Sequence, residues 1–151
     1  MLRRFYLIGL LALIMAIVAA VAVAGPWKGY RGSGGWGTDT PYNRLYNPSQ
    51  METLSGTVTA IEKTIPMKRM DYGVALIVKT EKETIPVHVG PSWFAERLDK
   101  PFAVGDKVEI KGVRSNYQGK AFIMAAEIKR GEEILVLRDA RGIPVWAGWR
   151  R

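Results

Sequence analysis

Few side chains of this sequence could carry catalytic chemistry. Among its 151 residues there is one histidine, His88, and no cysteine, which excludes disulfides, thiolate metal sites and covalent c-type haem attachment. No H-x-x-E, H-E-x-x-H or aspartate cluster accompanies His88, so it is at most a weak metal candidate. A Ser-His-acid arrangement would need Ser92 or Ser115, and nothing local marks either one as a nucleophile. The sequence therefore predicts a protein that is not an enzyme and that carries no cofactor.

Cations that lie close to aromatic side chains point to binding instead. Lys68 and Arg69 fall in one predicted loop, and Arg114 and Tyr117 fall in another, which Lys120 follows. Such combinations can hold an anion or stack a flat ligand. The alternative is that these charged loops are only solvated.

His88 and Trp93 complete the candidate groove. Because His88 alternates with Val87 and Val89, it is expected on the opposite, exposed face of its strand, beside Trp93. Its best functional role there would be a weak metal contact or a pH-sensitive contact. The predicted groove comprises Lys68, Arg69, His88, Trp93, Arg114, Tyr117 and Lys120.

A second candidate contact lies at the C-terminus. Trp149, Arg150 and Arg151 combine an amphipathic ring with two cations, which suits a lipid headgroup layer or a partner protein. Trp146 is expected instead to fold back and close an open end of the domain.

The segment from residue 51 to 151 must position these groups, and its pattern is that of a small all-β domain. Strands are expected at residues 54–64, 74–78, 83–89, 107–112, 120–129 and 134–138, with turns between them. One short helix is expected at 90–98, where Pro91 suits the first helical position and Phe94 and Leu98 share one side.

Three strands, a helix and two strands is the order of the OB-fold. Its ligand face is formed by the second and third strands and by the loops that join strands one to two and four to five. The predicted fold is therefore all-β with one short helix: an OB-fold-like five-stranded barrel plus an extra C-terminal strand and tail. A β-meander or an SH3-like barrel would share most of the pattern.

Residues 1–24 are predicted to be a signal peptide or an N-terminal membrane anchor. Arg3 and Arg4 precede an apolar run over 5–24, and the small-residue pattern Ala22-Val23-Ala24 ends it. The run of 20 residues is long enough to span a bilayer, so cleavage and retention as an inner-membrane anchor both remain open. Either outcome predicts a periplasmic location for the rest of the chain.

Residues 25–50 are rich in glycine and aromatic residues and lack the periodicity of a strand or a helix, so a linker is predicted. Its last part is expected to pack on the domain. Gly32, Gly35 and their neighbours do not mark a nucleotide site, because no strand precedes them and no helix can follow at residues 38–41.

Four stretches resemble a known family of exported bacterial OB-like proteins. They read S-G-T-V-T-A-I-E at 55–62, I-P-V-H-V-G-P-S-W-F at 85–94, G-D-K-V-E-I-K-G at 105–112 and L-R-D-A-R-G-I-P-V-W-A-G-W at 137–149. The family includes the C-terminal domain of the magnetosome-associated MamS and MamX proteins. The resemblance implies a periplasmic, membrane-associated accessory module, linked in some relatives to iron biomineralisation or redox proteins. The haem motifs of MamX-like relatives do not transfer, because this chain has no cysteine.

Three functions follow as hypotheses. The first is an exported, membrane-associated, non-catalytic OB-like module of the cell envelope that binds a protein partner or a small anionic ligand. The formal net charge of +8 agrees with an anionic partner. The second is a single-stranded nucleic-acid-binding OB-fold protein, which export would exclude. The third is an accessory role in periplasmic iron or redox handling.

Overall fold

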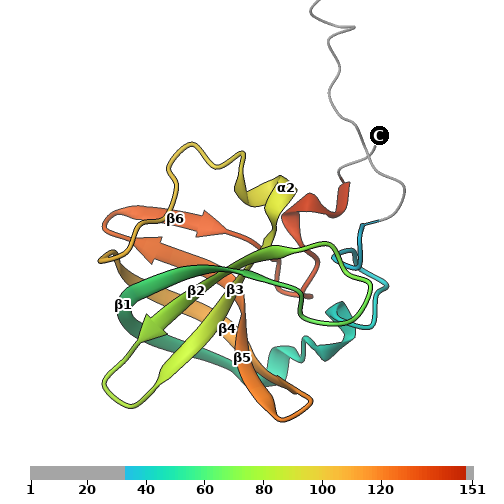
Figure 1. Ribbon diagram of the computed structural model, residues 1–151, viewed down its shortest axis with the longest axis horizontal. Coiled ribbons are helices and arrows are strands. Elements are labelled where there is room, and N and C mark those ends of the chain that lie inside the picture. The colour runs from blue at the N-terminus through green and yellow to red at the C-terminus, as the bar shows by residue number, and fades with distance from the viewer. Residues whose placement is uncertain (1–32, 149–151) are drawn as a thin grey trace, which may run out of the picture. The chain divides into compact units, whose positions relative to one another are not determined.

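The computed structural model describes residues 33–148. The predicted leader, the first part of the predicted linker, and Trp149, Arg150 and Arg151 lie outside these residues. The elements in chain order (Figure 1) are η1 (Asn43–Leu45), η2 (Pro48–Gln50), β1 (Met51–Thr64), β2 (Gly73–Lys79), β3 (Thr84–Pro91), α2 (Ser92–Ala95), β4 (Lys107–Tyr117), β5 (Lys120–Arg130), β6 (Glu133–Val136) and η3 (Val145–Gly148). No helix in the described range has the length and hydrophobicity that crossing a bilayer requires.

The six strands form one sheet in the order β3-β2-β1-β4-β5-β6. A parallel pairing of β3 with β5, which places Val87 opposite Ile123 and His88 opposite Met124, closes the first five strands into a ring. β6 pairs only with β5 and is the extra strand. The predicted all-β fold with OB-like strand order and an added C-terminal strand is thus confirmed.

Alternation of apolar and polar residues places the core inside this ring. In β4, Val108 and Ile110 are buried, whereas Lys107, Glu109 and Lys111 are exposed, as their alternation predicts. The other strands contribute a continuous apolar interior that includes Val58, Leu76, Val78, Ile85, Val87, Ile123 and Ile128. Burial of these side chains is the main stabilising contribution to the ring.

Two element boundaries differ from those predicted. The helix is a single turn, Ser92–Ala95, rather than residues 90–98. The turn predicted at 115–119 is shorter, because β4 continues to Tyr117 and only Gln118 and Gly119 link it to β5. Both residues have positive φ, 53° and 78°, as a tight two-residue hairpin turn requires.

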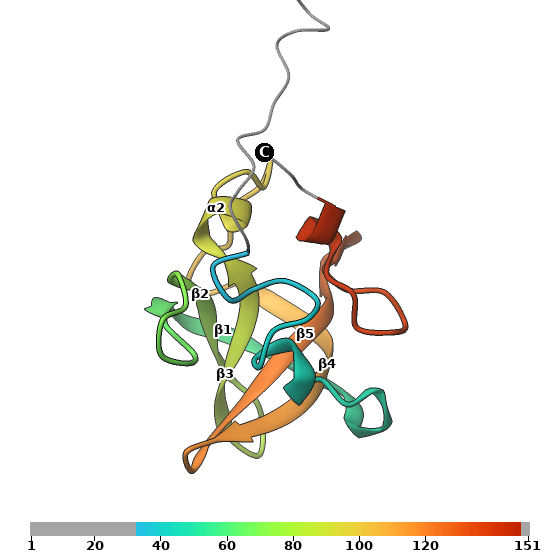
Figure 2. The same ribbon diagram turned by 90° about the vertical axis from the view of Figure 1, so that its right-hand side faces the viewer.

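Residues 33–50, which we call the strap, pack against the ring. Trp36, Tyr42 and Tyr46 are buried, with exposed fractions of 1%, 1% and 8%. Figure 2 shows the strap in cyan as it passes across the face where β3 meets β5. The second half of the predicted linker therefore belongs to the folded unit.

Residues 137–148, the tail, cover the ring beside the strap (Figure 2). Trp146 is 2% exposed and packs against Phe94 of α2, so the prediction that it folds back is confirmed. Its indole Nε1 donates a hydrogen bond of 2.7 Å to the carbonyl of Trp36, and the Trp36 indole donates one of 2.8 Å to the carbonyl of Asp71. The tail, the strap and the β1–β2 connection are thereby joined.

Candidate functional site

A pocket of 270 Å³ opens on the face formed by β2 and β3. It lies between the end of β1, with the connection that follows, and the turn that joins β4 to β5. Lys63, His88, Tyr117, Lys120 and Phe122 are among the residues that line it. This position is the ligand face of an OB-fold.

His88 forms the inner wall of the pocket. It is only 6% exposed, and its ring stacks on Phe122 of β5 with a centroid distance of 4.3 Å and an interplanar angle of 10°. The Tyr42 hydroxyl lies 2.9 Å from Nδ1. The expectation of an exposed His88 was wrong, because the strap brings Tyr42 over this face of β3.

Burial, together with the positive charge of Arg138, lowers the pKa of His88 to about 4. The imidazole is therefore neutral at pH 7, with one nitrogen as donor and the other as acceptor. Burial likewise raises the pKa of Tyr42 far above its ordinary value, so its hydroxyl keeps its proton.

Arg138, which follows β6, is the cation behind this pair. It is 4% exposed and donates hydrogen bonds to Asn43 Oδ1 and to the carbonyl of Gly142, the latter at 3.0 Å. Its positive charge also acts on the Tyr42 hydroxyl, where it partly opposes the rise in pKa that burial causes. Its guanidinium lies 5.2 Å from the ring centroid of Tyr46 and 5.5 Å from that of Trp146. Neutral dipoles and aromatic faces thus surround a buried cation.

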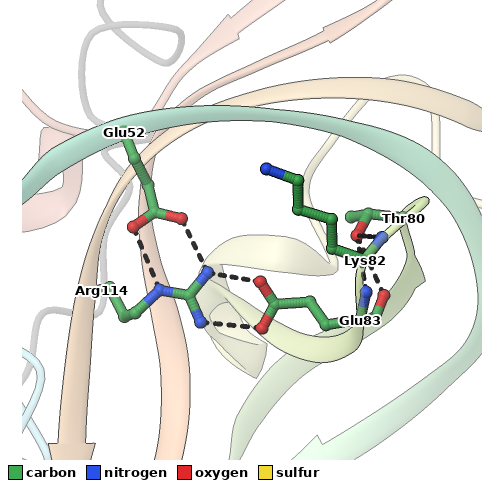
Figure 3. A network of polar contacts seen from close by, with 5 residues as sticks. All are labelled: Glu52, Thr80, Lys82, Glu83 and Arg114. Atoms are coloured by element: carbon green, nitrogen blue, oxygen red, sulfur yellow. Dashed lines mark hydrogen bonds and ion pairs between the residues drawn. The ribbon is translucent and has the colours of Figure 1, made fainter.

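Arg114, on β4, does not line the pocket. Figure 3 shows its guanidinium between the carboxylates of Glu52 and Glu83. Its guanidinium makes paired hydrogen bonds of 3.0 and 2.7 Å with Glu52 and of 2.8 and 2.6 Å with Glu83. Hydrogen bonds to Glu52 and then to Glu83 raise the pKa of Arg114 further. Thr80 holds Glu83 in place, because its hydroxyl accepts hydrogen bonds from the Lys82 and Glu83 amides at 3.2 and 3.1 Å.

The structure brings together three of the seven predicted groove residues. His88, Tyr117 and Lys120 line the pocket. Lys68 and Arg69 are exposed on the connection between β1 and β2 and do not line it. The remaining two, Trp93 on α2 and Arg114 on β4, also lie outside its lining. Arg114 is correspondingly removed from the candidate groove, because two carboxylates already occupy its donors.

The sequence reading missed Lys63, Phe122 and Tyr42. Lys63 lies at the end of β1, directly before the connection that frames an OB ligand face, and its ammonium stands 4.7 Å from the Tyr72 ring centroid. Phe122 was recognisable as an inward position of β5. No local pattern marks Tyr42, because its role depends on contacts with residues 46 or more positions away.

A larger, open depression of 610 Å³ lies elsewhere on the ring. Its lining includes Lys79, Glu81, Lys107, Glu109 and Lys129, whose side chains are all exposed. Glutamates lie among these lysines, so the positive charges do not converge on a single ligand. Nor do residues 33–148 bring three His, Asp or Glu side chains together in a way that could hold a metal ion.

The fold and the pocket define the class: a small all-β protein with OB-like strand order and, on its ligand face, a pocket lined by two lysines and one glutamate. A model of the MamS/MamX magnetosome protein family matches residues 50–135, and the chain belongs to this family. It is thus a magnetosome-associated protein by family. None of the curated proteins matches the chain. The matched range contains the pocket, whereas Tyr42, Arg138 and the predicted resemblance at 137–149 lie beyond it.

Proposed function

We propose that this protein is an exported, membrane-associated and non-catalytic module that assembles with an envelope protein by holding an acidic side chain of that partner in the pocket. The observation that carries the proposal is the lining of the pocket, in which Lys63 and Lys120 accompany the neutral, buried imidazole of His88 and outnumber the one carboxylate, Glu62. Two cations and one fixed polar ring suit a carboxylate.

The size of the pocket supports a single side chain as the occupant. Its 270 Å³ falls below the range of about 300–1,000 Å³ that is usual for sites that enclose small molecules. A side chain brought by a partner does not need full enclosure, because the surrounding protein surface supplies the rest of the contact.

The stacking arrangement disfavours the nucleic-acid alternative. Single-stranded nucleic acids bind OB-folds by stacking bases on aromatic rings along a cationic groove. Here Tyr42 of the strap already stacks near Phe122 and His88, with centroid distances of 6.3 and 5.9 Å. Each contacted phosphate needs its own cation, and Arg114 is already paired with two carboxylates.

The carboxylate proposal is tested by titrating the full chain, labelled with ¹⁵N, with N-acetyl-glutamate amide and with N-acetyl-glutamine amide. These probes share a shape and differ in charge. We expect the glutamate probe alone to shift the backbone signals of Lys63, His88 and Lys120, with millimolar affinity. Loss of one charged contact in Lys120→Ala is expected to weaken binding roughly threefold to tenfold.

Lys68→Ala is the matched control, because Lys68 is an equally exposed lysine that does not line the pocket. It should bind the glutamate probe as the wild type does. Equal binding of both probes, or equal loss in the two lysine variants, would contradict a carboxylate site at the pocket.

Export and membrane association rest on residues 1–24 and are tested separately. A phosphatase reporter fused after Arg151, active only outside the cytoplasm, should be active when the leader is intact and inactive when residues 5–24 are deleted. Fractionation of the intact chain then decides between an anchor and a cleaved signal. A cytoplasmic reporter would overturn the export proposal and favour the nucleic-acid alternative.

A further inference from the structure

We infer that Arg138 and Tyr42 hold His88 in the tautomer that carries its proton on Nε2, so that the pocket presents an N–H donor and selects an anionic oxygen acceptor over a metal ion. The inference rests on the proposed function in one respect only, which is that the pocket is the binding site. The tautomer itself follows from the hydrogen bonds behind the pocket.

The direction of the Tyr42 hydroxyl decides the tautomer. The positive charge of the Arg138 guanidinium acts on this hydroxyl, and a guanidinium carries donors and no acceptor. The lone pairs of the oxygen therefore favour the side of the cation, and the proton favours the opposite side. The neighbour at 2.9 Å on the other side is His88 Nδ1. Tyr42 therefore donates to Nδ1, Nδ1 acts as acceptor, and the ring proton is on Nε2.

The opposite tautomer leaves a buried proton without an acceptor. If Nδ1 carried the proton, the Tyr42 oxygen would accept from His88, and no other described residue hydrogen-bonds to the hydroxyl to take its proton. Tyr42 is 1% exposed, so bulk water cannot supply an acceptor. An orphaned buried hydroxyl shifts such an equilibrium by roughly tenfold or more.

Because Tyr42, which engages Nδ1, does not line the pocket, we assign the Nε2 edge of the His88 ring to the pocket. Nδ1 is engaged by Tyr42, and Nε2 bonds to no described residue, yet it is not among the fully buried polar atoms. The neutral ring therefore offers one donor to a pocket whose lining also includes Lys63, Lys120 and Glu62. A carboxylate of a ligand can accept from an imidazole N–H and from an ammonium group alike.

A metal ion needs the opposite arrangement. Coordination at Nε2 uses its lone pair, which requires the proton to sit on Nδ1. That change would reverse the hydrogen bond with Tyr42 and set the hydroxyl proton against Arg138. Arg138 and Tyr42 are in this sense positioning residues: they touch no ligand, but they determine which ligand His88 can accept.

The test exploits the fact that the chain has one histidine. Full-length protein purified without a histidine tag and labelled with ¹⁵N gives one set of imidazole signals in a two-bond ¹H–¹⁵N correlation spectrum. We expect the pattern of a neutral ring with protonated Nε2 throughout pH 6–8. A protonated Nδ1, an even mixture of tautomers or an imidazolium at pH 6 would overturn the inference.

Two further measurements sharpen the result. Tyr42→Phe keeps the stacked ring and removes the hydroxyl, so we expect a mixture of tautomers; an unchanged Nε2–H pattern would show that Tyr42 does not set it. Zinc chloride should leave the wild-type imidazole signals in place, and a zinc-induced shift of Nε2 would overturn the selection against metals.

Failure of this inference is distinguishable from failure of the proposed function. If the Nε2–H pattern is seen and the glutamate probe does not bind, the tautomer stands and the carboxylate site fails. If the probe binds while Nδ1 carries the proton, the site stands and the role of Arg138 and Tyr42 fails.

Discussion

The two arginines at positions 114 and 138 show opposite ways of placing a guanidinium in one small fold. Arg114 is about one-third exposed and is held by two carboxylates. Arg138 is 4% exposed and is held by an amide, a carbonyl and two aromatic faces. The first cation is neutralised where it lies, whereas the second acts on its surroundings.

This difference determines how far each charge reaches. Glu52 and Glu83 together carry two negative charges, which more than compensate the positive charge of Arg114. Arg114 therefore has little electrostatic effect on more distant groups. Among residues 33–148, no carboxylate hydrogen-bonds to Arg138, so its charge acts on Tyr42 and helps to keep His88 neutral. A charge in a low-dielectric interior interacts over longer distances than one at the surface. Arg138 therefore influences the pocket through Tyr42 and His88. Arg114 instead links β4 to Glu52 and Glu83 by ion pairs.

The largest expected effect is that of Arg138→Ala. The substitution leaves a cavity and removes the donors that serve Asn43 and the Gly142 carbonyl, so the strap and the tail lose their common partner. Lost packing and orphaned acceptors should lower the free energy of unfolding by about 3 kcal/mol or more. Chemical denaturation followed by tryptophan fluorescence measures it.

Arg138→Lys is the control for this variant. It keeps the cation but cannot reproduce the planar set of donors, so an intermediate loss is expected. A loss below about 1 kcal/mol for the alanine variant would mean that Arg138 does not join the strap to the tail.

The second effect is the pH dependence that His88 imposes. Its folded-state pKa of about 4 lies below the ordinary 6.5, so the unfolded chain binds the proton more readily. Stability is therefore complete above pH 6.5 and is lost as pH falls toward 4. Between pH 6.5 and 4.5 we expect a loss of about 2–3 kcal/mol.

This window separates His88 from the paired carboxylates. Glu83, Asp106 and Asp139 have pKa values held low by hydrogen bonds, so they lose their contribution only at more acidic pH. His88→Gln should unfold with a flat free energy between pH 6.5 and 4.5. An equally steep profile in that variant would assign the dependence to another group.

The sequence was sufficient for the parts of this molecule that depend on local pattern. The alternation in β4 and the order of strands around α2 predicted the ring correctly, because side chains of period two must bury one face. Tyr117, Lys120 and His88 line one pocket, since the OB-fold brings those segments together, and their role in binding a ligand stays a prediction.

What the sequence could not supply are contacts between distant segments. Arg114 reads as a free cation until the ring brings Glu52 and Glu83 to it from 62 and 31 residues away. His88 reads as exposed until a glycine-rich strap without periodicity covers it. The aromatic residues of such a segment gain a defined position only through tertiary packing.

The smallest expected effect is that of Arg114→Gln, which completes the contrast with Arg138. The side chains of Arg114, Glu52 and Glu83 are 34%, 35% and 38% exposed, so solvent screens the network and its loss should cost about 1 kcal/mol. The hydrogen bond from Arg114 holds the pKa of Glu83 below its usual range, so this contribution is present above about pH 4.5 and is lost as pH falls through the folded pKa.

Salt distinguishes the two arginines more sharply than the size of the loss. Raising the ionic strength from 0.1 to 1 M shortens the screening length from about 10 to about 3 Å. The difference between wild type and Arg114→Gln should shrink accordingly, whereas the difference between wild type and Arg138→Ala should persist, because solvent ions do not reach a buried guanidinium. Denaturation in urea measures both differences without adding ions. If both losses respond equally to salt, the two guanidinium groups share one environment, and the electrostatic reach assigned to Arg138 fails with the contrast.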